Sequence, residues 1–272
     1  MIKNIMTVDL EDHFCDLPFN MWKNYESRIV STTKTILDLF DKHKTQATFF
    51  TVGFIAEQHP ELIQEVISRG HEIASHSYSH PNLKEITKEN FESDLVKSIE
   101  SLRKISGGKI LGFRAPWFSI TKNNFWVFDI LKKYLKYDSS IFPIGPHYGF
   151  PNAPRYIYKM SEDDPLKEDN NGDFFELPMM TYPIPVLGNF PIAGGIYLRF
   201  LPDTLVKNGI KKFNRSGHPA ICYIHPEDLD FNRPHLEGTS WHNYWGLKNA
   251  YKKLESILTT FNFSSACDVL NL

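Results

Sequence analysis

The chain has 272 residues, of which 42% are hydrophobic and 14% aromatic, and this is enough to bury one sizeable core in a single large α/β domain. Lys and Arg total 30 against 32 for Asp and Glu, and neither sign forms a run long enough for a phosphate-binding or membrane-surface patch. We therefore do not expect nucleic acid to be a partner of this protein.

Two segments bear on membranes and targeting. Residues 177–198 carry no charged side chain, but their prolines and glycines oppose a continuous helix, so we expect no transmembrane segment there. At the N-terminus, Asp9, Glu11 and Asp12 interrupt the apolar region that a signal peptide needs. The sequence therefore predicts a location in the cytoplasm or at its membrane face.

Strands and helices are expected to alternate along the chain, from apolar runs, helical periodicity and Pro or Gly boundaries. The expected strands are 2–8, 47–52, 71–75, 109–113, 220–224 and 264–270, and residues 135–137 are also strand-like. The expected helices are 31–43 (with Ser31 or Thr32 as N-cap), 60–69, 88–105, 125–135 and 244–261.

This alternation predicts a mostly parallel sheet, and about seven strand–helix units in one domain favour a closed or nearly closed barrel. We expect one domain over residues 1–272. Residues 143–202 break the rhythm with many Pro, Gly and aromatic residues, so a long insertion over the barrel mouth is predicted there.

The strongest local signal is His76 and His80, four residues apart directly after a predicted strand and before Pro81. One turn of chain can point both imidazoles at one ion, and two histidines with one carboxylate leave room for water and substrate. The alternative is a pair of surface histidines in a polar loop.

An acidic cluster, Asp9, Glu11 and Asp12, follows the first predicted strand. Like charges at the end of an apolar strand are costly unless a cation or an arginine neutralises them. One carboxylate can complete a metal triad while another takes a proton from an activated water. A solvated loop or a helix N-cap is the alternative interpretation.

Three further positions follow predicted strands. Arg114, before Pro116 and Trp117, can hold a carboxylate through two hydrogen bonds, although ordinary loop packing is equally compatible. Asp138 can hydrogen-bond Arg114 or a histidine, or can be a turn residue. His225 can donate a proton to a leaving amine, or can be a core histidine bonded to backbone.

Read together, these motifs resemble the polysaccharide deacetylases of carbohydrate esterase family four, which carry the NodB-homology domain. The resemblance rests on five segments in order: residues 7–12 (TVDLED), 47–53 (ATFFTVG), 69–80 (RGHEIASHSYSH), 114–117 (RAPW) and 223–226 (YIHP). The Gly-Gly-x-Tyr-x-Arg segment at 194–199 resembles one carried by the branch of this family that is associated with exopolysaccharide biosynthesis.

The resemblance implies a distorted (β/α) barrel with one divalent ion, usually zinc. Carried over by motif, Asp9 is the general base, His76 and His80 are metal ligands, Arg114 orients the base, and His225 is the general acid. Asp138 is expected to tune His225 or its neighbours.

The third metal ligand stays open, because Leu10 and Glu11 stand between Asp9 and Asp12 where most family members have two adjacent aspartates. Strand alternation puts Asp9 and Glu11 on one face and favours Glu11, whereas a bulge can bring Asp12 to the ion. We prefer Asp12, because its side chain matches the usual aspartate ligand, and keep Glu11 as the alternative.

The expected reaction is removal of the acetyl group from an N-acetylated saccharide, which is the expected partner. Trp117 with its neighbour Pro116, Tyr197 and Trp241 are the expected contacts to sugar rings. Two alternatives remain: hydrolysis of a non-sugar amide such as a ureide or cyclic imide, and a non-catalytic carbohydrate-binding protein of the same fold.

Overall fold

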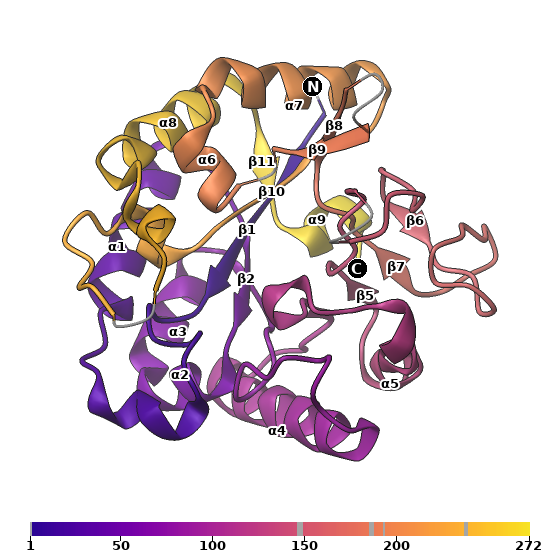
Figure 1. Ribbon diagram of the computed structural model, residues 1–272, viewed down its shortest axis with the longest axis horizontal. Coiled ribbons are helices and arrows are strands. Elements are labelled where there is room, and N and C mark those ends of the chain that lie inside the picture. The colour runs from indigo at the N-terminus through magenta and orange to yellow at the C-terminus, as the bar shows by residue number, and fades with distance from the viewer. Residues whose placement is uncertain (1, 146–148, 185–187, 193, 237–238) are drawn as a thin grey trace.

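A curled, mostly parallel sheet surrounded by helices forms the protein (Figure 1). The computed structural model describes residues 2–145, 149–184, 188–192, 194–236 and 239–272. The expected α/β class is confirmed, and the architecture is that of a distorted barrel.

The main sheet has the strand order β10-β1-β2-β3-β4-β5-β7-β6, with β11 paired to the start of β1. All of these pairs are parallel except β6 with β7, which is antiparallel. The strands are β1 (Asn4–Leu10), β2 (Thr48–Thr51), β3 (Glu72–Ser75), β4 (Gly112–Phe113), β5 (Tyr137–Asp138), β6 (Tyr158–Lys159), β7 (Phe175–Glu176), β10 (Ile221–Ile224) and β11 (Phe263–Ser264). A separate hairpin joins β8 (Thr181–Ile184) to β9 (Gly188–Pro191).

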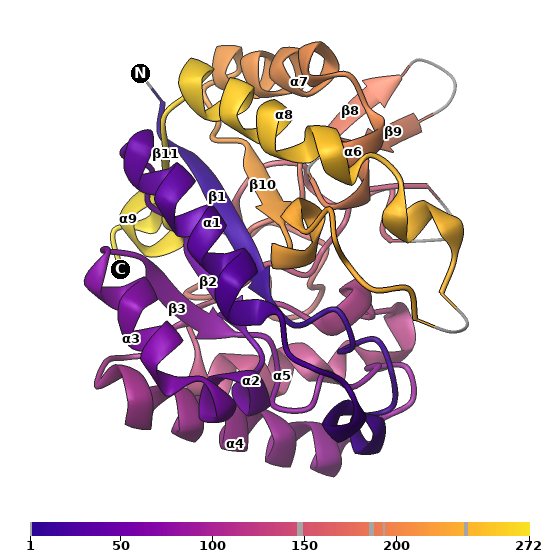
Figure 2. The same cartoon turned by 90° about the vertical axis from the view of Figure 1, so that its left-hand side faces the viewer.

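Helices connect successive strands and cover the outside of the sheet (Figure 2). They are α1 (Ile29–Lys42), α2 (Gly53–Gln58), α3 (Pro60–Ser68), α4 (Lys88–Ser106), α5 (Trp126–Tyr134), α6 (Ile196–Phe200), α7 (Asp203–Arg215), α8 (Leu247–Thr260) and α9 (Ala266–Leu270). Short 3-10 segments are η1 (Phe19–Asn24), η2 (Pro116–Phe118), η3 (Lys122–Asn124), η4 (Pro226–Leu229) and η5 (Trp241–Tyr244).

Two expected elements differ from the structure at their boundaries. The helix expected from residue 31 begins at Ile29, with Arg28 rather than Ser31 or Thr32 at its N-cap. The closing strand expected over 264–270 is only β11, because Ser265 caps α9 by accepting a hydrogen bond from the Asp268 amide. That local cap competes successfully with strand pairing.

Strand β1 lies between β10 and β2 in the sheet and is buried along its whole length. All of its residues, Asn4–Leu10, are buried, and it pairs with β10 over residues 5–8 and with β2 over residues 7–10. A strand covered on both faces is expected to be almost continuously apolar. The two polar residues that face the barrel interior near its end, Thr7 and Asp9, therefore need specific partners.

The barrel closes through very little backbone pairing. After β7, the chain approaches β10 through a hydrogen bond from the Met180 amide to the Ile221 carbonyl, at 3.3 Å. The segment 143–202 differs from the expected single insertion over the mouth. Its strand β7 extends the main sheet, and in its β8–β9 hairpin Tyr182 packs against Lys212 of α7, with the ammonium 4.9 Å from the ring centroid. Residues 146–148, 185–187 and 193 of that segment lie outside the described residues.

None of the helices in the described ranges combines the length and apolar character needed to cross a bilayer. The three cysteines, Cys15, Cys222 and Cys267, are free.

Candidate active site and metal centre

Four parallel strands deliver the candidate residues to one rim of the barrel. The parallel register sets Asp9 of β1 beside Phe50 of β2, Thr51 of β2 beside Ser75, and Ser75 of β3 beside Phe113 of β4. Chain that leaves the carboxyl ends of these strands therefore meets at one place, where α/β barrels keep their chemistry.

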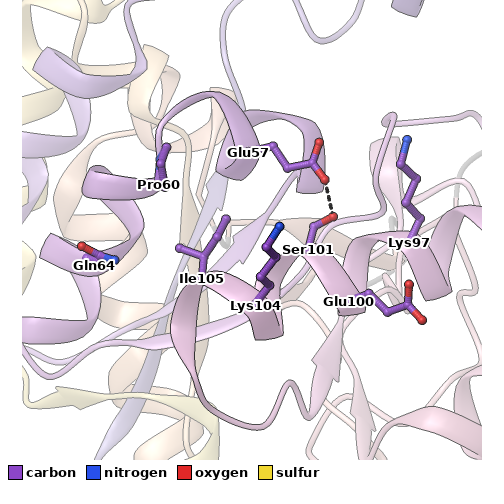
Figure 3. Close-up of a pocket in the computed structure, with 8 residues that line it drawn as sticks. All are labelled: Glu57, Pro60, Gln64, Lys97, Glu100, Ser101, Lys104 and Ile105. Atoms are coloured by element: carbon purple, nitrogen blue, oxygen red, sulfur yellow. Dashed lines mark hydrogen bonds between the residues drawn. The ribbon is translucent and has the colours of Figure 1, made fainter.

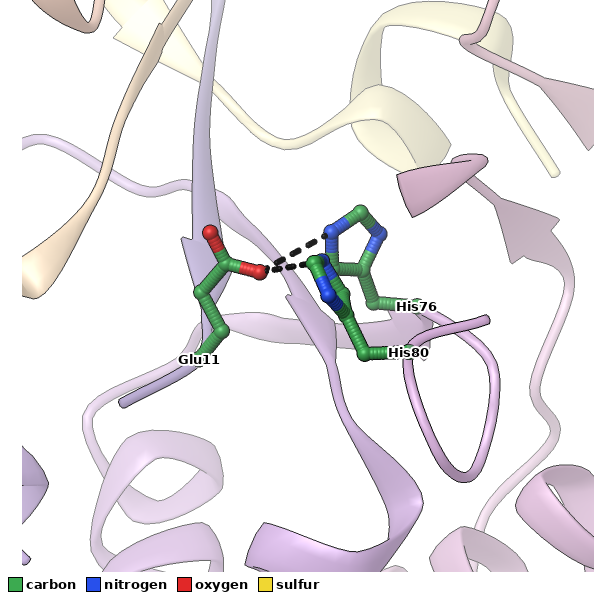
Figure 4. A group of neighbouring side chains, drawn as sticks. All are labelled: Glu11, His76 and His80. Atoms are coloured by element: carbon green, nitrogen blue, oxygen red, sulfur yellow. Dashed lines mark ion pairs between the residues drawn. The ribbon is translucent and has the colours of Figure 1, made fainter. Parts of the chain in front are cut away.

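Glu11, His76 and His80 form a buried group whose possible ligand atoms all lie within 4.8 Å of one another (Figure 4). Oε2 of Glu11 lies 2.5 Å from Nε2 of His80 and 3.5 Å from Nε2 of His76. In the figure the carboxylate and both rings converge on one point. Two imidazoles and a carboxylate are a common ligand set for zinc and its neighbours.

Backbone carbonyls hold both rings in the orientation that a metal ligand needs. Nδ1 of His76 lies 2.7 Å from the carbonyl oxygen of Arg114, and Nδ1 of His80 lies 3.1 Å from that of Cys15. A carbonyl oxygen only accepts, so each Nδ1 carries the proton, and each Nε2 presents a lone pair toward Glu11. The loop between the two histidines is strained, since Ser77 and His80 have φ of 65° and 53°.

The three side chains fit a cation because the lone pairs of Glu11 Oε2 and of the two histidine Nε2 atoms face one another. Oε2 of Glu11 is buried and accepts no hydrogen bond within the described residues, although Nε2 of His80 is close. Burial raises the pKa of Glu11, but the neighbouring imidazoles hold it well below the usual range. A positive charge at this point satisfies the carboxylate, and a divalent ion can supply it.

Asp12, the preferred third ligand from the sequence, is engaged elsewhere. Its Oδ1 accepts from the His13 amide at 2.9 Å, and its Oδ2 accepts from the Ser27 hydroxyl at 2.5 Å and the Arg28 amide at 3.1 Å. Asp12 thus ties the chain after β1 to the start of α1, and the structure brings the alternative, Glu11, into the group with the histidines.

Arg114 holds Asp9 in a fully buried ion pair. Nη1 of Arg114 donates to Oδ1 of Asp9 at 2.6 Å and to the Thr7 hydroxyl at 2.8 Å, while Nε and Nη2 donate to the carbonyl and hydroxyl of Ser139 at 3.0 and 2.8 Å. The guanidinium carbon also lies 4.2 Å from the ring centroid of Phe50. This leaves Oδ2 of Asp9 directed to the site.

His225 lies across the site from the histidine pair, at the end of β10. Its Nε2 is 3.7 Å from Oδ2 of Asp9 and 3.6 Å from Oε1 of Glu11, while its Nδ1 is 3.1 Å from Oδ2 of Asp228. Burial lowers the pKa of His225, but the hydrogen bond and charge of Asp228 with the other carboxylates raise it to about 10. His225 thus lies beside Asp9, and its partner Asp228 is a residue that the sequence analysis does not single out.

Asp138 lies away from His225, in a second buried acidic pair. Its oxygens accept from the amide and hydroxyl of Ser140 at 2.9 and 2.7 Å. Burial raises the pKa of Asp138 to about 6, and burial with the charge of Asp138 raises the pKa of Glu176 well above its usual range. Within the described residues, no hydrogen bond links Asp138 to Arg114 or His225, although the charge of Arg114 opposes the effect of burial on the pKa of Asp138. Its expected tuning role stays a prediction.

Among the expected sugar contacts, Trp117 lies nearest to the histidines. It is 38% exposed, packs edge-on against His80 with ring centroids 4.5 Å apart, and donates from Nε1 to Asp16 at 2.5 Å. Pro116 beside it is buried. Tyr197 lies on α6 and packs against Phe190, with ring centroids 6.3 Å apart.

A cavity of about 720 Å³ lies elsewhere, between α4 and the α2–α3 connection (Figure 3). Its lining includes Glu57, Lys97 and Lys104, and Ser101 donates to Glu57 at 2.5 Å. These are ordinary solvated helix side chains that carry none of the candidate chemistry.

Comparison with known proteins agrees with this geometry. Residues 19–146 match the polysaccharide deacetylase family, and residues 139–271 match a domain of unknown function, DUF3473. The chain therefore carries a polysaccharide deacetylase domain over residues 19–146. It is 34% identical over 91 residues to a peptidoglycan-N-acetylglucosamine deacetylase of Bacillus cereus, an alignment that covers 34% of this chain and 33% of that enzyme. The chain thus aligns with only about a third of the length of that curated relative.

Solved structures show the same fold. A structure from Mycobacterium smegmatis described as a polysaccharide deacetylase has a TM-score of 0.63 at 17% identity, covering 98% of this chain and 88% of that one. A family-four pseudoenzyme from Bacillus anthracis has a TM-score of 0.53 at 14% identity, covering 98% of this chain and 66% of that one. Since a pseudoenzyme shares the fold, activity depends on the residues of the site rather than on the fold.

Proposed function

We propose that this polysaccharide deacetylase family member is a metal-dependent hydrolase that removes the acetyl group from an N-acetylated sugar. One observation carries the proposal: Nε2 of His225 lies 3.7 Å from Oδ2 of Asp9, beside the Glu11–His76–His80 group. Arg114 holds the Asp9 carboxylate, and Asp228 holds the His225 imidazole. A base, an acid and a ligand set at one rim are what hydrolysis of an amide requires.

The ion belongs with Glu11, His76 and His80, and zinc is our choice because of the two imidazoles. When bound, it lowers the pKa of water toward about 7 and polarises a carbonyl oxygen. Asp12 is not proposed as a ligand, since its oxygens already accept hydrogen bonds from Ser27 and Arg28.

Asp9 and His225 then divide the proton transfers. Oδ2 of Asp9 takes the proton from the attacking water, because Arg114 occupies Oδ1 and holds the carboxylate in place. His225 gives a proton from Nε2 to the departing sugar nitrogen. Its side chain is 21% exposed against 3% for Asp9, so a substrate can reach it.

Exposed aromatic faces near the rim support a saccharide as substrate. Trp117 contacts His80 and is open to solvent, with Pro116 fixing its loop. Tyr197 and Trp241 stay predicted sugar contacts farther from the histidines, and Trp241 is 68% exposed. Aromatic rings of this kind can stack on the apolar faces of pyranose rings. The cytoplasmic location remains a prediction.

The test is acetate release by zinc-loaded protein from N-acetylhexosamine oligomers and lipid-linked N-acetylated sugars. We expect turnover in the wild type, retention in Asp38→Asn on the surface of α1, and a loss of at least about 100-fold in Asp9→Asn. Hydrolysis of a ureide, or opening of a cyclic imide to the half-amide, without acetate release from any sugar would favour the non-sugar amidase. Sugar binding without any turnover, unchanged by Asp9→Asn, would favour a non-catalytic binding protein.

A further inference from the structure

The segment of unknown function, residues 139–271, supplies one side of the site through three side chains. They are His225 at the end of β10, Asp228 in η4, and Arg199 in α6. His76, His80 and Arg114 come from the segment that matches the deacetylase family. Strand β1 precedes both matched segments, and its pairing with β10 brings Asp9 next to His225.

Asp228 contacts His225 twice. Oδ2 of Asp228 accepts from the His225 backbone amide at 2.9 Å and lies 3.1 Å from its Nδ1. A carboxylate at Nδ1 fixes the ring plane and keeps a proton on that nitrogen, so that Nε2 faces the site. Tyr223 packs edge-on against the His225 ring, with centroids 5.5 Å apart, and the Asp228 contact fixes which ring nitrogen faces Asp9.

Arg199 in turn holds Asp228. Its Nε lies 2.8 Å from Oδ1 of Asp228, and its Nη1 donates to the carbonyl oxygens of Asn243 and Trp245 at 2.7 and 3.1 Å. Arg199 and Asp228 are 6% and 1% exposed. An arginine fixed by two backbone carbonyls is a rigid counter-charge for a buried carboxylate.

The Gly-Gly-x-Tyr-x-Arg segment gains a physical explanation from these contacts. Gly194 has φ of 150°, and a Cβ there would lie 1.6 Å from the Tyr223 carbonyl oxygen; a Cβ at Gly195, with φ of 52°, would lie 2.9 Å from the Tyr223 ring. Only glycine allows this approach to β10. The two glycines dock the segment on the strand that ends in His225, and the arginine five residues after Gly194 reaches Asp228.

We propose that Arg199 and Asp228 are positioning residues for the proton-donating His225, and that this is the contribution of the segment of unknown function to the reaction. The proposal rests on the proposed function, in which His225 protonates the departing nitrogen. It assigns to Asp228 and Arg199 the part that the family resemblance assigned to Asp138, whose oxygens are occupied by Ser140.

The test compares two leaving groups in zinc-loaded protein. An acetamido sugar needs a proton on its nitrogen to leave, whereas nitrophenolate leaves from 4-nitrophenyl acetate without one. We expect Asp228→Asn to lower kcat on N-acetylhexosamine oligomers by about 100-fold or more, to change KM by less than about threefold, and to lower nitrophenyl acetate hydrolysis by less than about threefold. Arg199→Met should give the same pattern more weakly, and Arg199→Lys should recover part of the loss.

Asp230→Asn is the matched control, because Asp230 lies two residues further along and pairs with Arg28 rather than with His225. Its turnover on both substrates should stay within about threefold of the wild type. Equal losses on both substrates in Asp228→Asn, or no loss on the sugar, would overturn the proposal.

A crystal structure of Asp228→Asn separates this proposal from the proposed function. If wild-type protein releases no acetate from any sugar, the proposed function fails, but the orientation of His225 still reports on Asp228. We expect the His225 ring to turn away from Asp9 or to occupy several orientations. A ring that keeps Nε2 in its wild-type place shows that Asp228 does not position it.

Discussion

Replacing Arg114 with methionine takes a guanidinium away from Asp9 while keeping much of the side-chain volume. Arg114 is 0% exposed and Asp9 is 2% exposed, and their ion pair is 2.6 Å long. Removing one partner of a buried ion pair leaves an uncompensated charge, at a cost of about 3–5 kcal/mol. We therefore expect Arg114→Met to lower the free energy of unfolding by that amount, measured by urea denaturation at pH 7.

A surface arginine provides the control for this prediction. Arg69 pairs with Asp38, Asp41 and Glu65, whose side chains are more open to water, so Arg69→Met should cost about 1 kcal/mol or less. Adding Asp9→Asn to Arg114→Met removes the stranded carboxylate and should recover more than about 1 kcal/mol. Equal costs at the two arginines, or a further loss in the double variant, would refute the role of Arg114 as the partner that keeps Asp9 charged.

Three other outcomes follow from the structure. His71 is buried, its Nδ1 accepts from the Ala47 amide, and burial lowers its pKa to about 4. Because the fold favours the neutral imidazole, the free energy of unfolding should fall by up to about 3 kcal/mol as pH drops from about 6.5 to 4. Urea denaturation midpoints should depend less steeply on pH in His71→Gln. Gly112→Ala should destabilise by at least about 1–3 kcal/mol in thermal unfolding because its Cβ would lie 2.0 Å from the Tyr137 ring, whereas Gly108→Ala, which meets only a distant hydroxyl, should not. Trp117→Ala should raise KM for N-acetylhexosamine oligomers by about 10-fold with little change in zinc content, consistent with a stacking contribution of about 1.4 kcal/mol.

The parallel barrel was predictable because, in most of its elements, the hydrophobic periodicity and the capping residues indicate the same helix or strand. The helix at 88–105 shows the helical period, begins at Thr87, whose side chain caps it, and ends at Gly107 with φ of 66°. Its observed range is Lys88–Ser106. Apolar runs such as 220–224 likewise became buried strands. Short strands of two residues, such as β7, carry too little pattern to be found from sequence.

The choice between Glu11 and Asp12 depended on contacts that sequence spacing does not encode. Strand alternation favoured Glu11, and the preference for Asp12 relied on its side-chain length. In the structure the backbone amides of His13 and Arg28 and the hydroxyl of Ser27 surround Asp12. Residues 27 and 28 come close only because α1 packs back on the sheet.

Asp228 was missed for a related reason, although a signal was present. In His225-Pro-Glu-Asp228, the aspartate stands three residues after the histidine, the spacing of a capping box, and the structure shows that cap. Proline at the first position of η4 favours the turn that brings the two side chains together. Asp138 had an equally good position after a strand, but its neighbour Ser140 satisfies it locally.

Zinc binding by variants of Glu11 and Asp12 tests whether Glu11, His76 and His80 hold the metal ion. We predict one zinc ion per wild-type chain by elemental analysis. In competition titrations, zinc affinity should fall by at least about 100-fold in Glu11→Gln and in His80→Asn, and should change by less than about 10-fold in Asp12→Asn. Loss of zinc in Asp12→Asn with retention in Glu11→Gln, or wild-type protein that binds no divalent metal, would contradict it.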